Sequence, residues 1–139
     1  MVKLLIGHKG SGKTKKMIDF ANTALETANG SIVFINKNSR LMYDLKYKIR
    51  VVCMEDFDQI KNVDEYIGFI YGIISQDHDI EKIFIDSILK HADIKFENIE
   101  DFLERLELIS KTYNIEFIVS LSADREEIGE CINKYEVLN

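Results

Sequence analysis

The 139-residue sequence contains no proline and only two cysteines, and it has neither a long apolar run nor a long basic run. Because no proline-rich linker, repeat or compositional break divides the chain, we expect one domain over residues 1–139. Cys53 and Cys131 are far apart and lack metal-ligand spacing, which argues against zinc and a disulfide framework. No apolar run approaches the length of a membrane span, and the first is too short for a signal peptide. These absences predict a cytoplasmic protein without a membrane partner.

The charge balance restricts the kind of partner. The formal net charge is −6, with 46% hydrophobic and 30% charged residues, as in ordinary soluble globular proteins. An acidic chain disfavours a broad nucleic-acid surface, although a local basic patch is compatible with it. A nucleic acid is therefore not the expected direct ligand, whereas a protein partner or a homo-oligomer is left open.

The most informative stretch lies at the front of the chain. Residues 2–6 form a short apolar run typical of a strand, and the next eight follow the pattern G-x-x-x-x-G-K-[ST]: Gly7, His8, Lys9, Gly10, Ser11, Gly12, Lys13 and Thr14. Glycine lets successive backbone N–H groups point inward, and with the N-terminus of a following helix they form a nest for phosphate oxygens. Lys13 would then reach the β- and γ-phosphates, and the Thr14 hydroxyl would hold Mg²⁺.

The context of this motif supports it. Apolar residues at helical spacing predict a helix from Lys13 to about Ala28, which Gly30 would end. The motif therefore has a strand before it and a helix after it. The alternative is a glycine-rich turn with an incidental lysine.

The rest of the chain alternates between strand and helix patterns. Apolar runs predict strands at 31–36, 51–54, 82–86, 116–121 and 135–138, and helical spacing predicts helices from Ser39, over 64–75, over 98–113 and over 124–133. Residues 87–97 have no period and are expected to form an irregular connection. We expect Gly68 and Gly72 to permit close packing on the sheet, Asn98 to cap its helix, and Asp124 with Glu127 to form a capping pair. This alternation predicts an α/β fold with a mostly parallel sheet.

On Gly7–Thr14 the sequence resembles the P-loop nucleoside triphosphatases. In that family an acidic residue at the end of a second apolar strand positions Mg²⁺. The candidate is Asp86, which directly follows residues 83–85; the alternative is a carboxylate that faces solvent or caps the next segment. The later order of helix and strand is similar to the RecA-like branch of the family. This resemblance implies a three-layer sandwich in which the strand ending near Ser120 and Ser122 lies between the P-loop strand and the Asp86 strand, with one of these serines sensing the γ-phosphate.

The sequence also departs from that branch. Many RecA-like ATPases have a glutamate directly after the magnesium-associated aspartate, whereas this chain has Ser87. Glu55 or Asp56 could supply the missing base from another strand end, or both could be helix N-terminal carboxylates. Arg125 is the arginine we expect first to stabilise transferring phosphate, and its alternative is an ordinary surface position. The two other histidines, at 78 and 91, have no partner spacing that suggests metal binding or catalysis.

The expected function is Mg²⁺-dependent binding of a nucleoside triphosphate with slow hydrolysis. ATP is implied by the RecA-like resemblance alone, because no motif in this sequence reads the base. One alternative is a switch without turnover, in which bound nucleotide orders a loop such as 87–97. The other is a phosphotransferase similar to thymidine kinase, although the zinc-binding cysteines and basic lid of those enzymes are missing.

Overall fold

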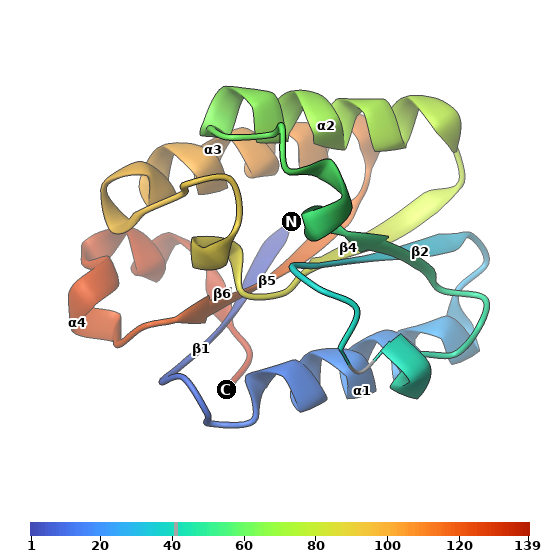
Figure 1. The fold of residues 1–139 in the computed structure, drawn as a ribbon, viewed down its shortest axis with the longest axis horizontal. Helices are drawn as coiled ribbons and strands as arrows, with labels where there is room; N and C mark the ends of the chain where they lie inside the picture. Colours follow the sequence, from blue (N-terminus) through green and yellow to red (C-terminus); the bar gives the residue numbers. More distant parts are fainter. Residues whose placement is uncertain (41) are drawn as a thin grey trace.

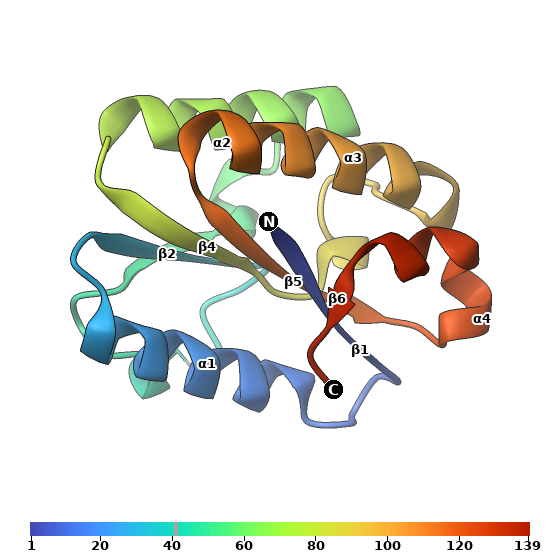
Figure 2. The same cartoon turned by 180° about the vertical axis from the view of Figure 1, so that it is seen from behind.

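The computed structural model describes residues 1–40 and 42–139, which form a six-stranded parallel sheet between two layers of helices. The strands lie in the order β3-β2-β4-β5-β1-β6. Helix α1 covers one face and helices α2 and α3 cover the other (Figures 1 and 2). The predicted three-layer α/β sandwich is confirmed.

The strands are β1 (Val2–Gly7), β2 (Ser31–Asn36), β3 (Arg50–Cys53), β4 (Ile80–Ile85), β5 (Glu116–Ser122) and β6 (Glu136–Val137). The helices are α1 (Lys13–Thr27), α2 (Val63–Gln76), α3 (Phe96–Tyr113) and α4 (Arg125–Ile128). The described residues also form four short 3₁₀ turns: η1 (Met42–Asp44), η2 (Met54–Phe57), η3 (Ile88–Lys90) and η4 (Glu130–Lys134).

The core consists of two apolar clusters, one on each face of the sheet. Successive side chains of a strand point to opposite faces, so Leu4 joins the cluster beneath α2 and α3 while Leu5 joins the cluster beneath α1. In the same way Ile83 and Phe84 lie on opposite faces. Because both faces of the central strands are covered, these strands are continuous apolar runs in the sequence.

The order of the strands brings the predicted site residues to one edge of the sheet. β5 pairs with β1 on one side and with β4 on the other, as the RecA-like resemblance implies. Since all strands are parallel, the residues that follow β1, β4 and β5 meet at the carboxyl edge, where ligands of open α/β sheets bind. Among the described residues, no helix is both long and apolar enough to cross a membrane.

The glycines of the connections differ from their predicted roles. Helix α1 ends at Thr27 without Gly30, and Gly30 instead lies against the loop before β4. A Cβ on Gly30 would come within 1.9 Å of the Asp79 carbonyl oxygen. Gly68 and Gly72 face open space on the exposed side of α2, so the prediction that they pack on the sheet is wrong.

Several element boundaries also differ. Helix α3 begins at Phe96, and Asn98 lies in its first turn, where its side chain accepts a hydrogen bond from the Lys95 N–H. The helix expected over 124–133 is broken at Gly129, whose φ is +85°. The helix expected from Ser39 is reduced to the 3₁₀ turn η1, and Leu41, one of the residues behind that prediction, lies outside the described residues. The irregular connection over 87–97 contains the turn η3.

Candidate functional site

The loop between β1 and α1 has the backbone that its glycines make possible. Gly10 and Gly12 both have a φ of +84°, a conformation that a side chain makes unfavourable. A Cβ on Gly7 would lie 2.7 Å from the Ser11 hydroxyl oxygen. The loop thus leads directly into the N-terminus of α1, whose first backbone N–H groups have no partner inside the helix.

Lys13 folds back over this loop. Its Nζ donates to the His8 carbonyl oxygen at 2.7 Å and lies 3.5 Å from the Ser11 hydroxyl, and the residue is only 7% exposed. Burial lowers the pKa of Lys13, the Asp86 carboxylate opposes this, and the Lys90 charge adds to the lowering. The ammonium group therefore lies within the loop, bound to one backbone carbonyl oxygen that an anion could replace.

Asp86 is held at both of its carboxylate oxygens. Oδ2 accepts a hydrogen bond from the Thr14 hydroxyl at 2.8 Å, and Oδ1 accepts one from the Ser120 hydroxyl at 2.6 Å. Asp86 is 1% exposed. The two residues predicted as Mg²⁺ ligands, Thr14 and Asp86, are thus brought into contact. A hydroxyl and a carboxylate both provide oxygen ligands, which Mg²⁺ prefers. Proteins commonly bind Mg²⁺ with one or two such side chains together with the phosphates of a substrate.

The two serines at the end of β5 have different surroundings. Ser120 is fully buried, and its hydroxyl both donates to Asp86 and accepts from the Ser87 N–H at 2.7 Å. We therefore assign Ser120 to positioning Asp86. Ser122 is half-buried opposite Gly7 in the sheet register, and its predicted catalytic role stays a prediction.

A cavity of about 520 Å³ lies beside these residues at the carboxyl edge of the sheet. It is lined by Lys9, Thr14, Asn36, Lys37, Asn38, Arg40, Glu55, Asp86, Ser87 and Lys90. Glu55 is part of this lining and Asp56 is not. The Glu55 N–H donates to the Lys37 carbonyl oxygen at 2.9 Å, which holds η2 beside the end of β2. A larger cavity of about 640 Å³ lies at the opposite edge of the sheet, and none of the predicted catalytic, nucleotide-binding or metal-binding residues lines it.

Sequence reasoning missed part of the positive charge of this cavity. Lys37 and Lys90 were not singled out, and Arg40 also contributes to the lining. Lys37 directly follows β2 and Lys90 ends the turn after Asp86. Their position just beyond the carboxyl ends of strands is the signal that could have identified them.

Other predicted residues lie at the rim or outside. His8 Nε2 lies 2.8 Å from the Asp124 carboxylate, which joins the loop to the start of α4. The predicted capping pair is confirmed, since the Asp124 N–H donates to Glu127 at 3.1 Å. Arg125 is exposed as the first residue of α4, and it does not line the cavity that contains Thr14 and Asp86.

His91 is a buried histidine that follows η3. Its Nδ1 lies 3.1 Å from the Tyr66 hydroxyl, and its Nε2 forms no hydrogen bond within the described part of the chain. Burial lowers the pKa of His91 to about 4; the nearby Asp86 backbone opposes this, and Lys37 and Lys90 add to the lowering. This histidine is therefore neutral at pH 7 and ties the segment after Asp86 to α2.

Comparisons with known proteins agree with this geometry. The model of a family described as RNA helicase matches residues 4–80, more than half of the chain, including the glycine-rich loop but not Asp86. A KaiC-like protein from the hyperthermophilic archaeon Pyrococcus horikoshii OT3 has a similar structure, with a TM-score of 0.65 and 23% sequence identity. That match covers 94% of this chain and 67% of the archaeal chain, and it shows the fold. No curated protein matches the sequence. The chain belongs to the RNA helicase family, and it is a P-loop NTPase with the RecA-like fold.

Proposed function

We propose that residues 1–139 form a single P-loop domain that binds ATP with Mg²⁺ and hydrolyses it slowly. The observation that carries this proposal is the chain of hydrogen bonds from Thr14 through Asp86 to Ser120, directly beneath the phosphate-binding loop. It aligns a hydroxyl and a carboxylate from separate elements at the point where the loop enters α1.

Each part of the site has a distinct task in this proposal. The N–H groups of the loop and of the first turn of α1 bind phosphate oxygens. Lys13 exchanges the His8 carbonyl oxygen for phosphate oxygens, and Thr14 with Asp86 holds Mg²⁺. When bound, Mg²⁺ neutralises charge on the β- and γ-phosphates.

Slow turnover follows from the residue after Asp86. Ser87 carries no carboxylate, its backbone is left-handed with φ 59°, and its N–H is bound to Ser120. We therefore assign the orientation of the attacking water to Glu55, which among the described residues is the one carboxylate besides Asp86 that lines the cavity.

Calorimetry of Asp86→Asn tests this function. Binding of a non-hydrolysable ATP analogue should weaken at least about tenfold with Mg²⁺ present, and much less in EDTA, because the carboxylate acts through the ion. Asp93→Asn is a matched control: Asp93 is exposed, and its left-handed backbone (φ 55°) is one that asparagine tolerates. Equal losses with and without Mg²⁺ would make Asp86 structural, and a native protein that binds no nucleotide would overturn the proposal.

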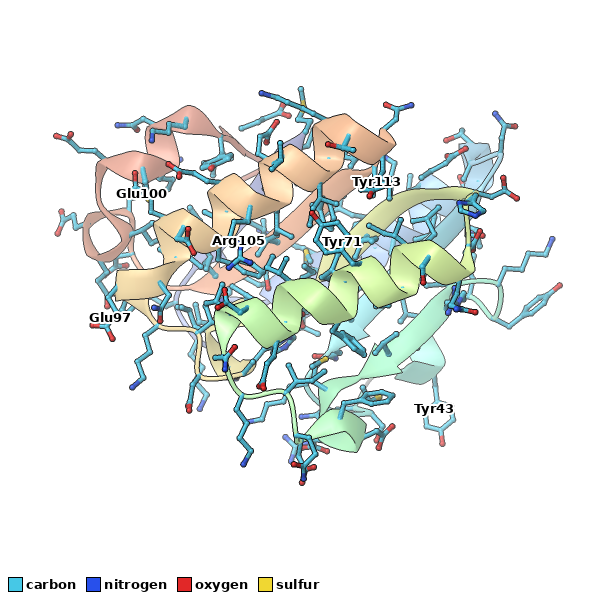
Figure 3. All side chains as sticks on the ribbon, turned by 90° about the horizontal axis from the view of Figure 1, so that it is seen from above. Tyr43, Tyr71, Glu97, Glu100, Arg105 and Tyr113 are labelled. Carbon is cyan, nitrogen blue, oxygen red and sulfur yellow. The ribbon has the colours of Figure 1, made fainter. Side chains whose placement is uncertain are left out.

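A second candidate function is turnover stimulated by RNA, the substrate that the family's description names. The observation that favours it is the segment from 37 to 50, which carries five cationic residues and one acidic residue in a chain of net charge −6. Tyr43 and Tyr47 in this segment are 99% and 91% exposed, and Figure 3 shows Tyr43 pointing away from the protein. Exposed aromatic rings beside cations suit stacking on single-stranded bases. Phosphate release with and without single-stranded RNA, for the native protein and for Tyr43→Ala with Tyr47→Ala, tests this candidate.

A further inference from the structure

Two neighbouring cavities share one wall. One is the cavity of about 520 Å³ that Thr14 and Asp86 line (the nucleotide cavity), and the other is a second cavity of about 310 Å³. Both are lined by Lys37, Glu55 and Lys90. The second cavity continues from this wall toward the segments around Phe57 and Ala92. The three shared residues therefore form the wall between the nucleotide cavity and the second cavity.

Lys90 projects from a rigid turn. Its N–H donates to the Ser87 carbonyl oxygen at 2.9 Å, and Ser87 is in turn bound to the buried Ser120. Ile88, inside the turn, is fully buried, and His91, directly after it, is bound to Tyr66. The backbone of Lys90 is thus fixed relative to Asp86, while its exposed side chain retains its reach.

The charge of Lys90 acts on the phosphate-binding lysine. Burial is the main cause of the lowered pKa of Lys13, the Asp86 carboxylate opposes it, and the Lys90 charge adds a smaller lowering. In the part of the chain that the structure describes, neither Lys37 nor Lys90 forms an ion pair. Four cationic side chains, at positions 9, 37, 40 and 90, line the nucleotide cavity against the two carboxylates of Glu55 and Asp86.

An unbalanced group of cations is unfavourable without an anion near it, and an added phosphate group relieves the repulsion. Lys13 reaches the β- and γ-phosphates from the loop side. Lys90 and Lys37 belong to the wall that this cavity shares with the second cavity. The terminal phosphate is the part of the nucleotide that lies farthest from the base and nearest to the attacking water.

We propose that Lys90, assisted by Lys37, contacts the terminal phosphate of the bound triphosphate. This proposal rests on the proposed function and deepens it. The water oxygen forms a bond to the γ-phosphorus, the bond from that phosphorus to the bridging oxygen breaks, and ADP leaves with the electron pair. The water proton passes to Glu55 and then to solvent. The two ammonium groups stabilise the charge on the transferring group, a task that an arginine performs in other P-loop NTPases.

The test compares Lys90→Met and Lys37→Met with Lys61→Met. Lys61 is an exposed lysine that lines the second cavity and not the nucleotide cavity, so it is the matched control. Lys90→Met should bind the non-hydrolysable ATP analogue at least about tenfold more weakly while ADP affinity changes by less than about threefold. The turnover number at saturating ATP should fall at least about tenfold. Lys37→Met should show the same pattern more weakly, and Lys61→Met should match the native protein.

The outcomes separate this inference from the function on which it rests. If the native protein binds neither nucleotide, the proposed function fails. If it binds both and Lys90→Met loses equal affinity for each, or none, the contact to the terminal phosphate is wrong and the function stands. Thermal unfolding of each variant confirms that the fold is retained, which is expected because Lys90 is exposed.

Discussion

Asp86 is a buried carboxylate, and two hydroxyl groups form hydrogen bonds with it. Thr14 and Ser120 each donate to one of its oxygens, which offsets the cost of removing the charge from water. Both donors are uncharged, so either one can give way to an ion without leaving a second buried charge behind. This arrangement suits a residue whose partner changes when Mg²⁺ and nucleotide bind.

At this same scale, Glu55 and Asp56 should differ in their effect on turnover. Glu55→Gln should lower the rate of phosphate release at least about tenfold, because positioned acid–base help contributes roughly a hundred- to ten-thousand-fold. Asp56→Asn, the control one residue away, should leave the rate within about twofold, since Asp56 does not line the cavity. Steady-state phosphate release measures both.

The reverse ranking would assign the base to Asp56, and an active enzyme that neither change affects would remove both carboxylates from the mechanism. Tight binding with no turnover in the native protein would instead favour the nucleotide-dependent switch. Phosphate appearing on an added acceptor, and not in solution, would favour the phosphotransferase.

Residues of the site could be predicted where a motif or a strand end fixed them. The loop pattern specified Lys13 and Thr14, and an apolar run followed by a carboxylate specified Asp86. The choice between Glu55 and Asp56 depends on how η2 lies beside the end of the neighbouring strand β2, where the Glu55 N–H donates to the Lys37 carbonyl oxygen, and no local pattern encodes this contact. Lys37 and Lys90 are exposed lysines, and their convergence is visible only once β2 and β4 are neighbours.

At the scale of elements, the coverage of the sheet on both faces explains which strands could be recognised in the sequence. Strands covered on both sides are long apolar runs, so β1, β2, β4 and β5 were predicted close to their observed bounds. Glycines carry no such signal, because one residue type serves as a helix end, a close contact or an exposed helical position. Within this one chain, Gly30 makes a close contact, whereas Gly68 and Gly72 are exposed positions in a helix.

Alanine substitutions at these glycines should have opposite effects. Gly30→Ala should destabilise the protein by roughly 1–3 kcal/mol, because its Cβ would overlap the Asp79 carbonyl oxygen and force the backbone apart. Gly68→Ala and Gly72→Ala should each stabilise it by about 0.5–1 kcal/mol, since open space surrounds them and alanine favours the helix. Urea unfolding measures all three. A neutral Gly30→Ala would mean that the loop before β4 can move away at little cost.

At the scale of the whole molecule, stability depends on the joint between the sheet and the helices α2 and α3 that pack on it. His91 and Tyr66 lie in that joint: the Tyr66 ring packs edge-on against Phe102 of α3, and its hydroxyl meets His91. Both residues are almost completely buried. The segment that positions Asp86 and the larger apolar cluster are therefore parts of one packed unit.

This joint should make the protein sensitive to acid. The pKa of His91 is about 4 in the folded chain against an ordinary value of 6.5, because burial disfavours its charged form. Between these pH values the unfolded chain binds a proton that the folded chain excludes, so the free energy of unfolding falls as the pH is lowered through this window. The full effect of this one group is about 3 kcal/mol, reached below pH 4.

His91→Gln removes the titrating group and should flatten this dependence. Urea unfolding of the native protein and of the variant at several pH values between 7 and about 4.5 isolates the histidine from the carboxylates, which titrate in both. If His91→Gln does not fold, the ring resonances of His91 in the native protein give the same information, since they should not titrate above about pH 5. A His91 that titrates near 6.5, or a variant with the native pH profile, would show that the Tyr66–His91 joint opens to water in the folded protein.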